Sequence, residues 1–170
     1  MLAAYLLQAI ERHADKLAEA LIRDLTTNPP TPSFRRLPVD ALWQRAHDIY
    51  GHLADWLAGR DDADVEATFD ALGRQRFSEQ IPLEELVYAL ILTQQHLRER
   101  ISSLGEAESA IELHYQIDLQ AMLGRFFDRA LYATVKGYEA ARRAPPAPER
   151  REAWARFGIQ TSGNLGAWMP

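Results

Sequence analysis

The sequence predicts an all-α protein, a single-domain bundle of about five helices that ends in a long C-terminal helix. Apolar residues recur every three to four positions over most of the 170 residues, which is the period of an amphipathic helix. Clusters of proline and glycine separate the periodic segments, and no segment alternates as a strand does. Apolar residues make up 47% of the chain and charged residues 25%, so a core can form without disulfides or metals.

The first two helices are expected on either side of a proline-rich loop. The first spans about residues 2–26, and prolines at 29, 30 and 32 place a loop over 27–37. The second begins at Pro38 and ends near Gly59. The apolar face of the first helix is Leu6, Ile10, His13, Leu17 and Leu21. The face of the second is Leu42, Ala46, Ile49, Leu53 and Trp56, widened by Trp43, Tyr50 and Leu57.

The third and fourth helices are expected to begin with acidic residues, which complement the positive end of a helix dipole. The third starts at residues 61–62 and the fourth at Pro82, beside Glu84 and Glu85. The inner face of the third is Val65, Phe69, Leu72 and Arg76, and that of the fourth is Leu83, Leu86, Leu90, Gln94, Leu97, Ile101 and Leu104. Tyr88 and Leu92 lie nearly opposite this face, which is typical of a helix that is central or lies at an interface.

The last helix is expected over about 106–142, so its length is on the order of 50 Å. Its inner face is Leu119, Leu123, Phe126, Ala130, Thr134 and Tyr138, widened by Met122, Phe127 and Leu131. Prolines at 145, 146 and 148 end it. The predicted organisation is therefore a helical domain over 1–143 and a proline-rich linker with an aromatic-containing tail over 144–170. Trp154 and Trp168 in that tail are expected to dock on another surface.

Composition and charge exclude several classes of function. The chain has no cysteine, which removes disulfides, thiolate nucleophiles and cysteine-ligated metals, and a cytosolic location is natural for such a chain. The net charge is −5, whereas nucleic-acid binders usually carry a basic surplus. No run of 18 or more apolar residues exists, and the apolar start lacks the basic flank of a signal peptide. We expect no nucleic-acid partner and no membrane insertion.

No catalytic or metal-binding motif emerges from the sequence. His13 is centred on an apolar stripe, so it could be a ligand contact or haem axial ligand, or simply a histidine at the core edge. The aromatic residues could line a pocket or pack as ordinary core. We retain one set as candidate ligand contacts: His13, Trp43, Tyr50 and Phe126. Arg74 and Arg76 could bind an anion, although a solvated or salt-bridged surface is the simpler interpretation.

A second candidate set concerns protein contact. These are apolar side chains that either meet another chain or meet other helices of the same chain, and the pattern does not separate the two. They are Tyr88, Leu92, Leu131, Val135 and Tyr138, together with Trp154 and Trp168 of the tail.

Two phrases, residues 69–77 and 80–90, are more specific than an apolar stripe. They resemble the N-terminal domain of the RsbRD type of RsbT co-antagonist proteins, in which a Leu-Gly and an Arg precede a Gly-Ile-Pro-Leu-x-Glu start of a long helix. The resemblance covers about residues 1–142. Gln80 departs from it, since a glycine is common there, and a proline-rich tail stands in place of an output domain. The resemblance implies a sensory or regulatory helical domain, possibly globin-related, that need not hold haem and has no catalytic residues.

The expected function is therefore a non-enzymatic signalling or regulatory domain that acts through a protein partner, and a second copy of the chain is one candidate for that partner. The alternative is a small-molecule or haem-binding sensor with a pocket inside the bundle. A third hypothesis is an enzyme whose site uses scattered acidic residues and arginines. No motif supports this hypothesis.

Overall fold

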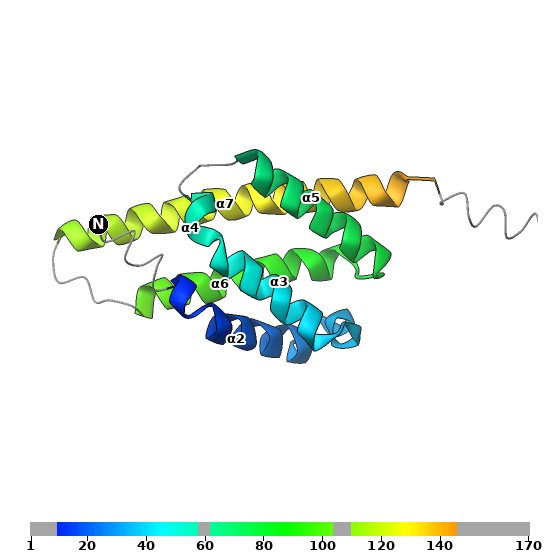
Figure 1. Cartoon of the computed structure of the whole chain (residues 1–170), viewed down its shortest axis with the longest axis horizontal. Helices are drawn as coiled ribbons and strands as arrows, with labels where there is room; N and C mark the ends of the chain where they lie inside the picture. The colour runs from blue at the N-terminus through cyan, green and yellow to red at the C-terminus, as the bar shows by residue number, and fades with distance from the viewer. Residues whose placement is uncertain (1–9, 58–61, 104–109, 146–170) are drawn as a thin grey trace, which may run out of the picture.

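The computed structural model describes residues 10–57, 62–103 and 110–145, which form an elongated helical bundle (Figure 1). The regular elements within these residues are all helical, so the prediction of an all-α fold is confirmed. They are α2 (Ala14–Thr27), the 3₁₀ helix η1 (Pro32–Arg36), α3 (Val39–Gly51), α4 (Leu53–Leu57), α5 (Asp62–Ser78), α6 (Leu83–Ser103) and α7 (Ala110–Arg143). The predicted Leu6, Gly59, Leu104, Trp154 and Trp168 lie outside the described residues, as does the tail from residue 146 onward.

The first predicted helix contains a break. Residues 10–12 are helical, but His13 is a turn residue with φ −112° and ψ 15°, and α2 begins after it. The face of α2 is buried as its periodicity predicts, with Leu17, Leu21 and Leu25 all below a tenth exposed. The helix ends where Thr31, from the proline loop, donates its hydroxyl to the Leu25 carbonyl over 2.8 Å.

The loop predicted over 27–37 contains a short 3₁₀ helix that the sequence analysis did not anticipate. Pro32 occupies its first turn, and Phe34 is 2% exposed, so the segment contributes to the core. Glu85 of α6 anchors it, because the Ser33 backbone N–H and hydroxyl each donate to one carboxylate oxygen over 2.8 Å. Glu85 is buried, so the interpretation of this residue as only a partner of the helix dipole was incomplete.

The second predicted helix is divided into α3 and α4. The break lies at His52, whose Nδ1 is 2.8 Å from the Asp48 carbonyl oxygen at the end of α3. Backbone hydrogen bonds continue across the break, from the His52 N–H to the Asp48 carbonyl and from the Trp56 N–H to the His52 carbonyl. The apolar stripe is maintained across the break, and Tyr50 and Leu53 are fully buried.

The α5–α6 connection is a tight turn. Gln80 has φ 59°, in the left-handed region; its N–H donates to the Phe77 carbonyl and the Ile81 N–H donates to the Arg76 carbonyl, each over 3.0 Å. These two bonds define a Schellman ending, in which glycine usually takes the left-handed position. Ile81 is completely buried, and its carbonyl accepts the Tyr138 hydroxyl of α7 over 2.9 Å.

The longest helix, α7, runs along almost the full length of the described molecule (Figure 1) and has 34 residues. It packs closely against α5 through two glycines. A Cβ on Gly73 would lie 2.0 Å from the Thr134 carbonyl oxygen, and a Cβ on Gly137 would lie 2.1 Å from the Asp70 carbonyl oxygen. The two backbones are therefore in direct contact, and only glycine fits at either position.

Aromatic residues fill the centre where α4, α5 and α7 meet. Trp56 stacks on Phe126 with ring centroids 5.6 Å apart, and Phe69 meets the edge of Phe126 at 5.8 Å. On the opposite side, His96 of α6 contacts Asp24 of α2 over 2.8 Å. No helix in the described part of the chain is both long and apolar enough to cross a membrane.

Candidate functional site

Two arginines border a small hollow between α2, α3, α5 and α6. Arg45 of α3 and Arg76 of α5 both line this hollow, whose volume is about 50 Å³. The rest of the lining is apolar except for Thr93, whose hydroxyl donates to the Ala89 carbonyl over 2.8 Å. The apolar lining consists of Leu21, Leu25, Phe34, Leu42, Ala46, Ile49, Leu72, Leu86, Ala89 and Leu90.

Arg76 is buried rather than solvated, which corrects one interpretation of the sequence. It is 5% exposed, and its Nη1 donates to the Glu79 carboxylate over 2.5 Å. Its guanidinium lies 5.7 Å from the centre of the Phe34 ring. The salt bridge with Glu79 agrees with the expected paired arginine, but the Arg76 side chain lies in the interior of the bundle rather than on its surface.

Arg45 is half-buried beside Arg76. Burial lowers the pKa of Arg45, the positive charge of Arg76 lowers it further, and Glu79 and Asp48 oppose these effects. Its Nη2 donates to the Gln75 side-chain oxygen, which is neutral. Within the described residues Arg45 forms no ion pair, so the local positive charge is only partly compensated.

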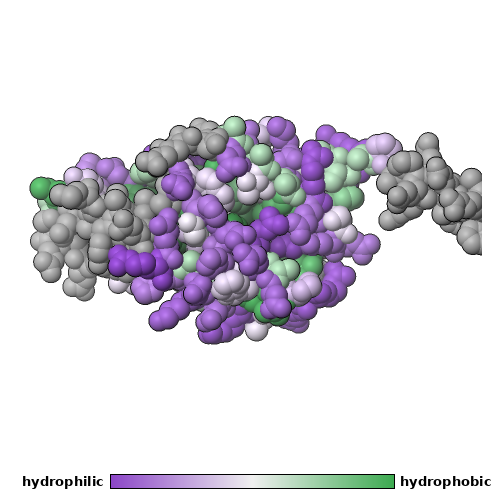
Figure 2. Space-filling model, viewed as in Figure 1, coloured by the Kyte–Doolittle hydropathy of each residue, from purple (hydrophilic) through white to green (hydrophobic). Residues whose placement is uncertain are grey.

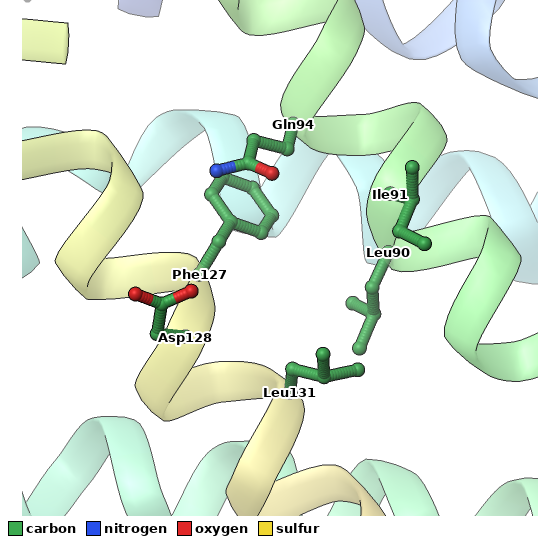
Figure 3. A pocket seen from close by; sticks show the side chains of 6 residues that line it. All are labelled: Leu90, Ile91, Gln94, Phe127, Asp128 and Leu131. Atoms are coloured by element: carbon green, nitrogen blue, oxygen red, sulfur yellow. The ribbon is translucent and has the colours of Figure 1, made fainter.

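A shallow groove separates α6 and α7. Figure 3 shows side chains of α6 facing side chains of α7 across it. The groove is polar at Gln94 and Asp128 and otherwise apolar, and Ile91 on its edge is 39% exposed. The lining is Leu90, Ile91, Gln94, Phe127, Asp128 and Leu131.

A wider hollow lies between α4, α5 and α7, with a volume of about 350 Å³. Arg125 and Arg129 lie on its wall. Trp56 and Phe126 contribute the aromatic part of its lining.

The start of α7 carries apolar side chains in contact with solvent. Ile111 is 68% exposed, Leu113 51%, Tyr115 39% and Ile117 56%. The face of the molecule in Figure 2 is mostly hydrophilic, with small apolar areas between polar ones, so four such residues within seven positions are unusual. Exposed apolar patches of this kind mark interaction sites more often than solitary exposed residues do.

The four predicted ligand contacts do not meet in one hollow. His13 is half-buried at the start of α2, and Trp43 stacks on His47 with ring centroids 4.8 Å apart. Tyr50 is fully buried with no hydrogen-bond partner for its hydroxyl, and burial raises its pKa well above the usual value. Phe126 lines the hollow near α4, but the other three residues line none of the three hollows described above. No histidine is among the residues that line these three hollows.

The predicted interface residues are divided between interior and surface. Leu92 and Tyr138 are buried within this chain, so they follow the alternative in which they meet helices of the same chain. Tyr88, Leu131 and Val135 are partly exposed, and Leu131 borders the groove in Figure 3. The sequence analysis did not anticipate the exposed apolar residues at the start of α7, because they point to more than one side of the helix and so do not belong to its periodic inner face.

Groups able to hold a metal are not found among the described residues: no three histidine or acidic side chains gather there. The most closely associated charged side chains near a hollow are Arg45, Arg76 and Glu79. Sequence reasoning singled out Arg76, but Arg45 was missed because its neighbours are 30 or more positions away along the chain.

Comparison with family profiles places these features in context. The profile described as the RsbT co-antagonist protein rsbRD N-terminal domain matches residues 9–158. The chain belongs to this family. The predicted resemblance to the RsbRD N-terminal domain is thereby confirmed, and the match continues past the predicted domain end at residue 143. Neither a curated protein nor a solved structure matches the chain, so the suggested relation to globins stays a prediction.

Membership of the RsbRD N-terminal family indicates a regulatory domain of a signalling pathway. The arginine that follows Leu-Gly in the pattern given above is Arg76 in this chain. Arg76 is buried and lines the hollow between α2, α3, α5 and α6. The position where the family commonly has glycine corresponds to Gln80, the left-handed residue of the α5–α6 turn.

Proposed function

We propose that this RsbRD-type domain regulates a signalling pathway without catalysis of its own, through contact with another protein at the start of α7. The observation that supports the proposal is the exposed apolar patch of Ile111, Leu113, Tyr115 and Ile117, called here the α7 start patch. A cytoplasmic location, in keeping with the absence of cysteine, is part of the same proposal.

The geometry of a helix supports contact on more than one side of this segment. Leu113 and Ile117 are four positions apart and share one face, and Ile111 and Tyr115 share another. A helix that is apolar on two sides is stable when other protein surrounds it. Because the contact needs apolar area rather than a specific charge, apolar substitutions should preserve it and charged ones should abolish it.

The partner we propose is a second copy of the chain. A two-fold dimer uses the same patch on both subunits, and a straight helix with apolar side chains at one end is complementary to itself in the antiparallel direction. Pairing two copies through the Leu113 and Ile117 face would cover one of the two apolar sides of this segment.

The oligomeric state tests this proposal directly. Sedimentation velocity on the full chain should show a monomer–dimer equilibrium between about 1 and 100 µM. Ile117→Arg places an unpaired charge in the contact and should weaken association by about tenfold or more. Tyr132→Arg is the matched control, since Tyr132 is also exposed on α7 but lies outside the patch.

Two results would contradict the proposal. A chain that is monomeric across this range gives no support for self-association, and equal effects of Ile117→Arg and Tyr132→Arg would remove the patch from the contact. The non-enzymatic part has its own test: substrate turnover that depends on Arg45, Arg76 or Glu79 would contradict it.

A further inference from the structure

We infer that the hollow between α4, α5 and α7 binds a small aromatic carboxylate, with the carboxylate at Arg125 and the ring among the apolar side chains of the wall. None of the four residues of the α7 start patch lines this hollow, so either inference can fail without the other.

The hollow is large enough for such a ligand. Its volume of about 350 Å³ lies within the range of ordinary small-molecule sites, about 300–1,000 Å³. The hollow between α2, α3, α5 and α6 has about 50 Å³ and the groove between α6 and α7 about 40 Å³, which suffices for a few water molecules. Of the three hollows described above, this one alone can therefore accept an organic molecule.

One face of α7 supplies most of the wall, through residues three and four positions apart. These residues are Met122, Arg125, Phe126 and Arg129. The short helix α4 and the first turn of α5 supply the rest, which is apolar. These residues are Trp56, Leu57 and Val65.

The apolar part of the wall suits a ring better than an alkyl chain. Trp56 and Met122 are both partly exposed, and the Trp56 indole stacks on Phe126 with ring centroids 5.6 Å apart. Aromatic side chains and thioethers interact with a ring more favourably than the covered area alone accounts for. An alkyl chain in the same place would gain only from the apolar area that it covers.

The charged part of the wall favours an anion. Two arginines line the hollow, and no acidic residue is among its described lining residues. Asp64 is bonded to the wall, because it accepts the Trp56 indole N–H over 3.1 Å, but its one charge balances only one of the two arginines.

Of the two arginines, Arg125 is the one available to a ligand. Arg129 already takes part in another interaction, whereas Arg125 makes no hydrogen bond or ion pair with another described residue. A guanidinium group presents two parallel N–H groups that match the two oxygens of a carboxylate. Because Arg125 is exposed, the ion pair alone is weak, so ring and charge must act together.

Three small probes separate the ring from the charge, each titrated into the full chain by calorimetry at neutral pH. 2-Naphthoate has the ring and the charge, 2-naphthol has the same ring without charge, and acetate has the charge without a ring. We expect 2-naphthoate to bind at one site per chain and 2-naphthol to bind about threefold to tenfold more weakly. Acetate should give no saturable heat.

Two variants test the charge, each checked for helical content by circular dichroism. Arg125→Gln should weaken 2-naphthoate about threefold to tenfold and leave 2-naphthol within about twofold. Arg23→Gln makes the same change at an exposed arginine of α2 outside the hollow and should alter the binding of neither probe. Both side chains are exposed, so we expect both variants to fold like the parent.

A methionine resonance tests the place of the ring. The chain has three methionines, at positions 1, 122 and 169, so the methyl groups of a ¹³C-methyl-methionine sample give few resonances. The Met122 resonance, identified by its loss in Met122→Leu, should shift on addition of 2-naphthoate because an aromatic ring changes the local magnetic field. Acetate should leave it in place.

Four results would overturn the inference. They are no binding of 2-naphthoate to the folded chain, equal affinity for 2-naphthoate and 2-naphthol, equal affinity of Arg125→Gln and Arg23→Gln for 2-naphthoate, and a Met122 resonance that stays in place when 2-naphthoate is saturating.

Discussion

The contact between α5 and α7 and the hollow beneath α2 and α3 lie on neighbouring faces of one helix, α5, and they are built in different ways. At Gly73 and Gly137 the two backbones touch, and no room exists for a methyl group. Three residues after Gly73, Arg76 lines a hollow of about 50 Å³. Side-chain size therefore differs between the two faces of α5: glycine brings the backbones together on one, and the long side chain of Arg76 lies on the other.

This contrast shows where the fold cannot accept added side-chain volume and where it can accept some. A close helix crossing depends on small residues at a few positions, and a single added carbon displaces backbone. A face beside a small hollow accommodates a little added volume, and the neighbouring η1 depends on the two hydrogen bonds from Ser33 to Glu85. The following substitutions test the contrast from the largest expected effect to the smallest.

Gly137→Ala should be the most damaging of these changes. The new Cβ would meet the Asp70 carbonyl oxygen at 2.1 Å, so α5 and α7 must separate, at a cost of about 3 kcal/mol or more in the free energy of unfolding. Urea denaturation followed by circular dichroism measures it. Gly124→Ala on the same helix is the control, since its nearest neighbour is the Arg98 Nη2 at 3.9 Å, and it should gain about 0.5–1 kcal/mol from helix propensity. Equal stability of the two variants would contradict direct backbone contact between α5 and α7 at Gly137.

Glu85→Ala should have the next largest effect. It removes both acceptors of Ser33 and leaves a partly buried N–H and hydroxyl without partners, which costs about 1.5–3 kcal/mol. The neighbouring Glu84 is exposed, so Glu84→Ala should lose only about 0.5 kcal/mol, as a dipole partner does. Thermal unfolding of both variants checks this difference. If they melt together, η1 does not depend on Glu85.

Ala89→Leu tests how much added volume the hollow beside α5 accepts. It adds three carbons next to the hollow, whereas Gly137→Ala adds one carbon at the crossing. The hollow of about 50 Å³ accommodates only part of the new side chain, so we expect a loss of about 1 kcal/mol in the free energy of unfolding. A loss as large as that of Gly137→Ala would mean that the hollow is not available to side chains.

Gln80→Gly should stabilise the chain slightly. Gln80 has φ 59°, a conformation that glycine adopts freely, so the change should gain about 0.5–1 kcal/mol. Ser78→Gly, two positions earlier within α5, should instead lose about 0.5–1 kcal/mol. Opposite signs for the two glycine variants in urea denaturation are the expected result; a loss in both would show that residue 80 is not strained.

Tyr50→Phe should have the smallest effect at neutral pH, and its clearest signal at alkaline pH. The Tyr50 hydroxyl is buried without a partner, so its removal should change the free energy of unfolding by no more than about 1 kcal/mol, as a gain. Burial raises the pKa of Tyr50, so above about pH 10 the unfolded chain loses this proton while the folded chain keeps it. Stability of the parent should therefore fall as pH rises, and fall less in Tyr50→Phe. Identical alkaline unfolding curves would show that Tyr50 has access to water.

The sequence predicted the helices and their buried faces well where the periodicity was unbroken. Val65, Phe69, Leu72 and Arg76 are all buried on α5, and the six residues expected inside α7 are all buried. These faces follow from local spacing alone, because the core side of a helix repeats every three to four residues.

The features that were missed depend on partners far apart along the chain. The 3₁₀ helix is held by Glu85, 52 positions after Ser33, and Arg45 gains its significance from Gln75 and Arg76 on another helix. The breaks at His13 and His52 were missed because apolar spacing continues through both. Predicted contacts such as His13 and Phe126 share no hollow because periodicity places a residue on a face without saying which other helix it meets.

The two glycines also decide how this molecule can change shape. Interlocked backbones cannot slide or rotate past one another without losing contact, so α5 and the C-terminal half of α7 form one stiff beam. A rearrangement that widens the space around Arg76 would therefore move α2 and α3 relative to that beam.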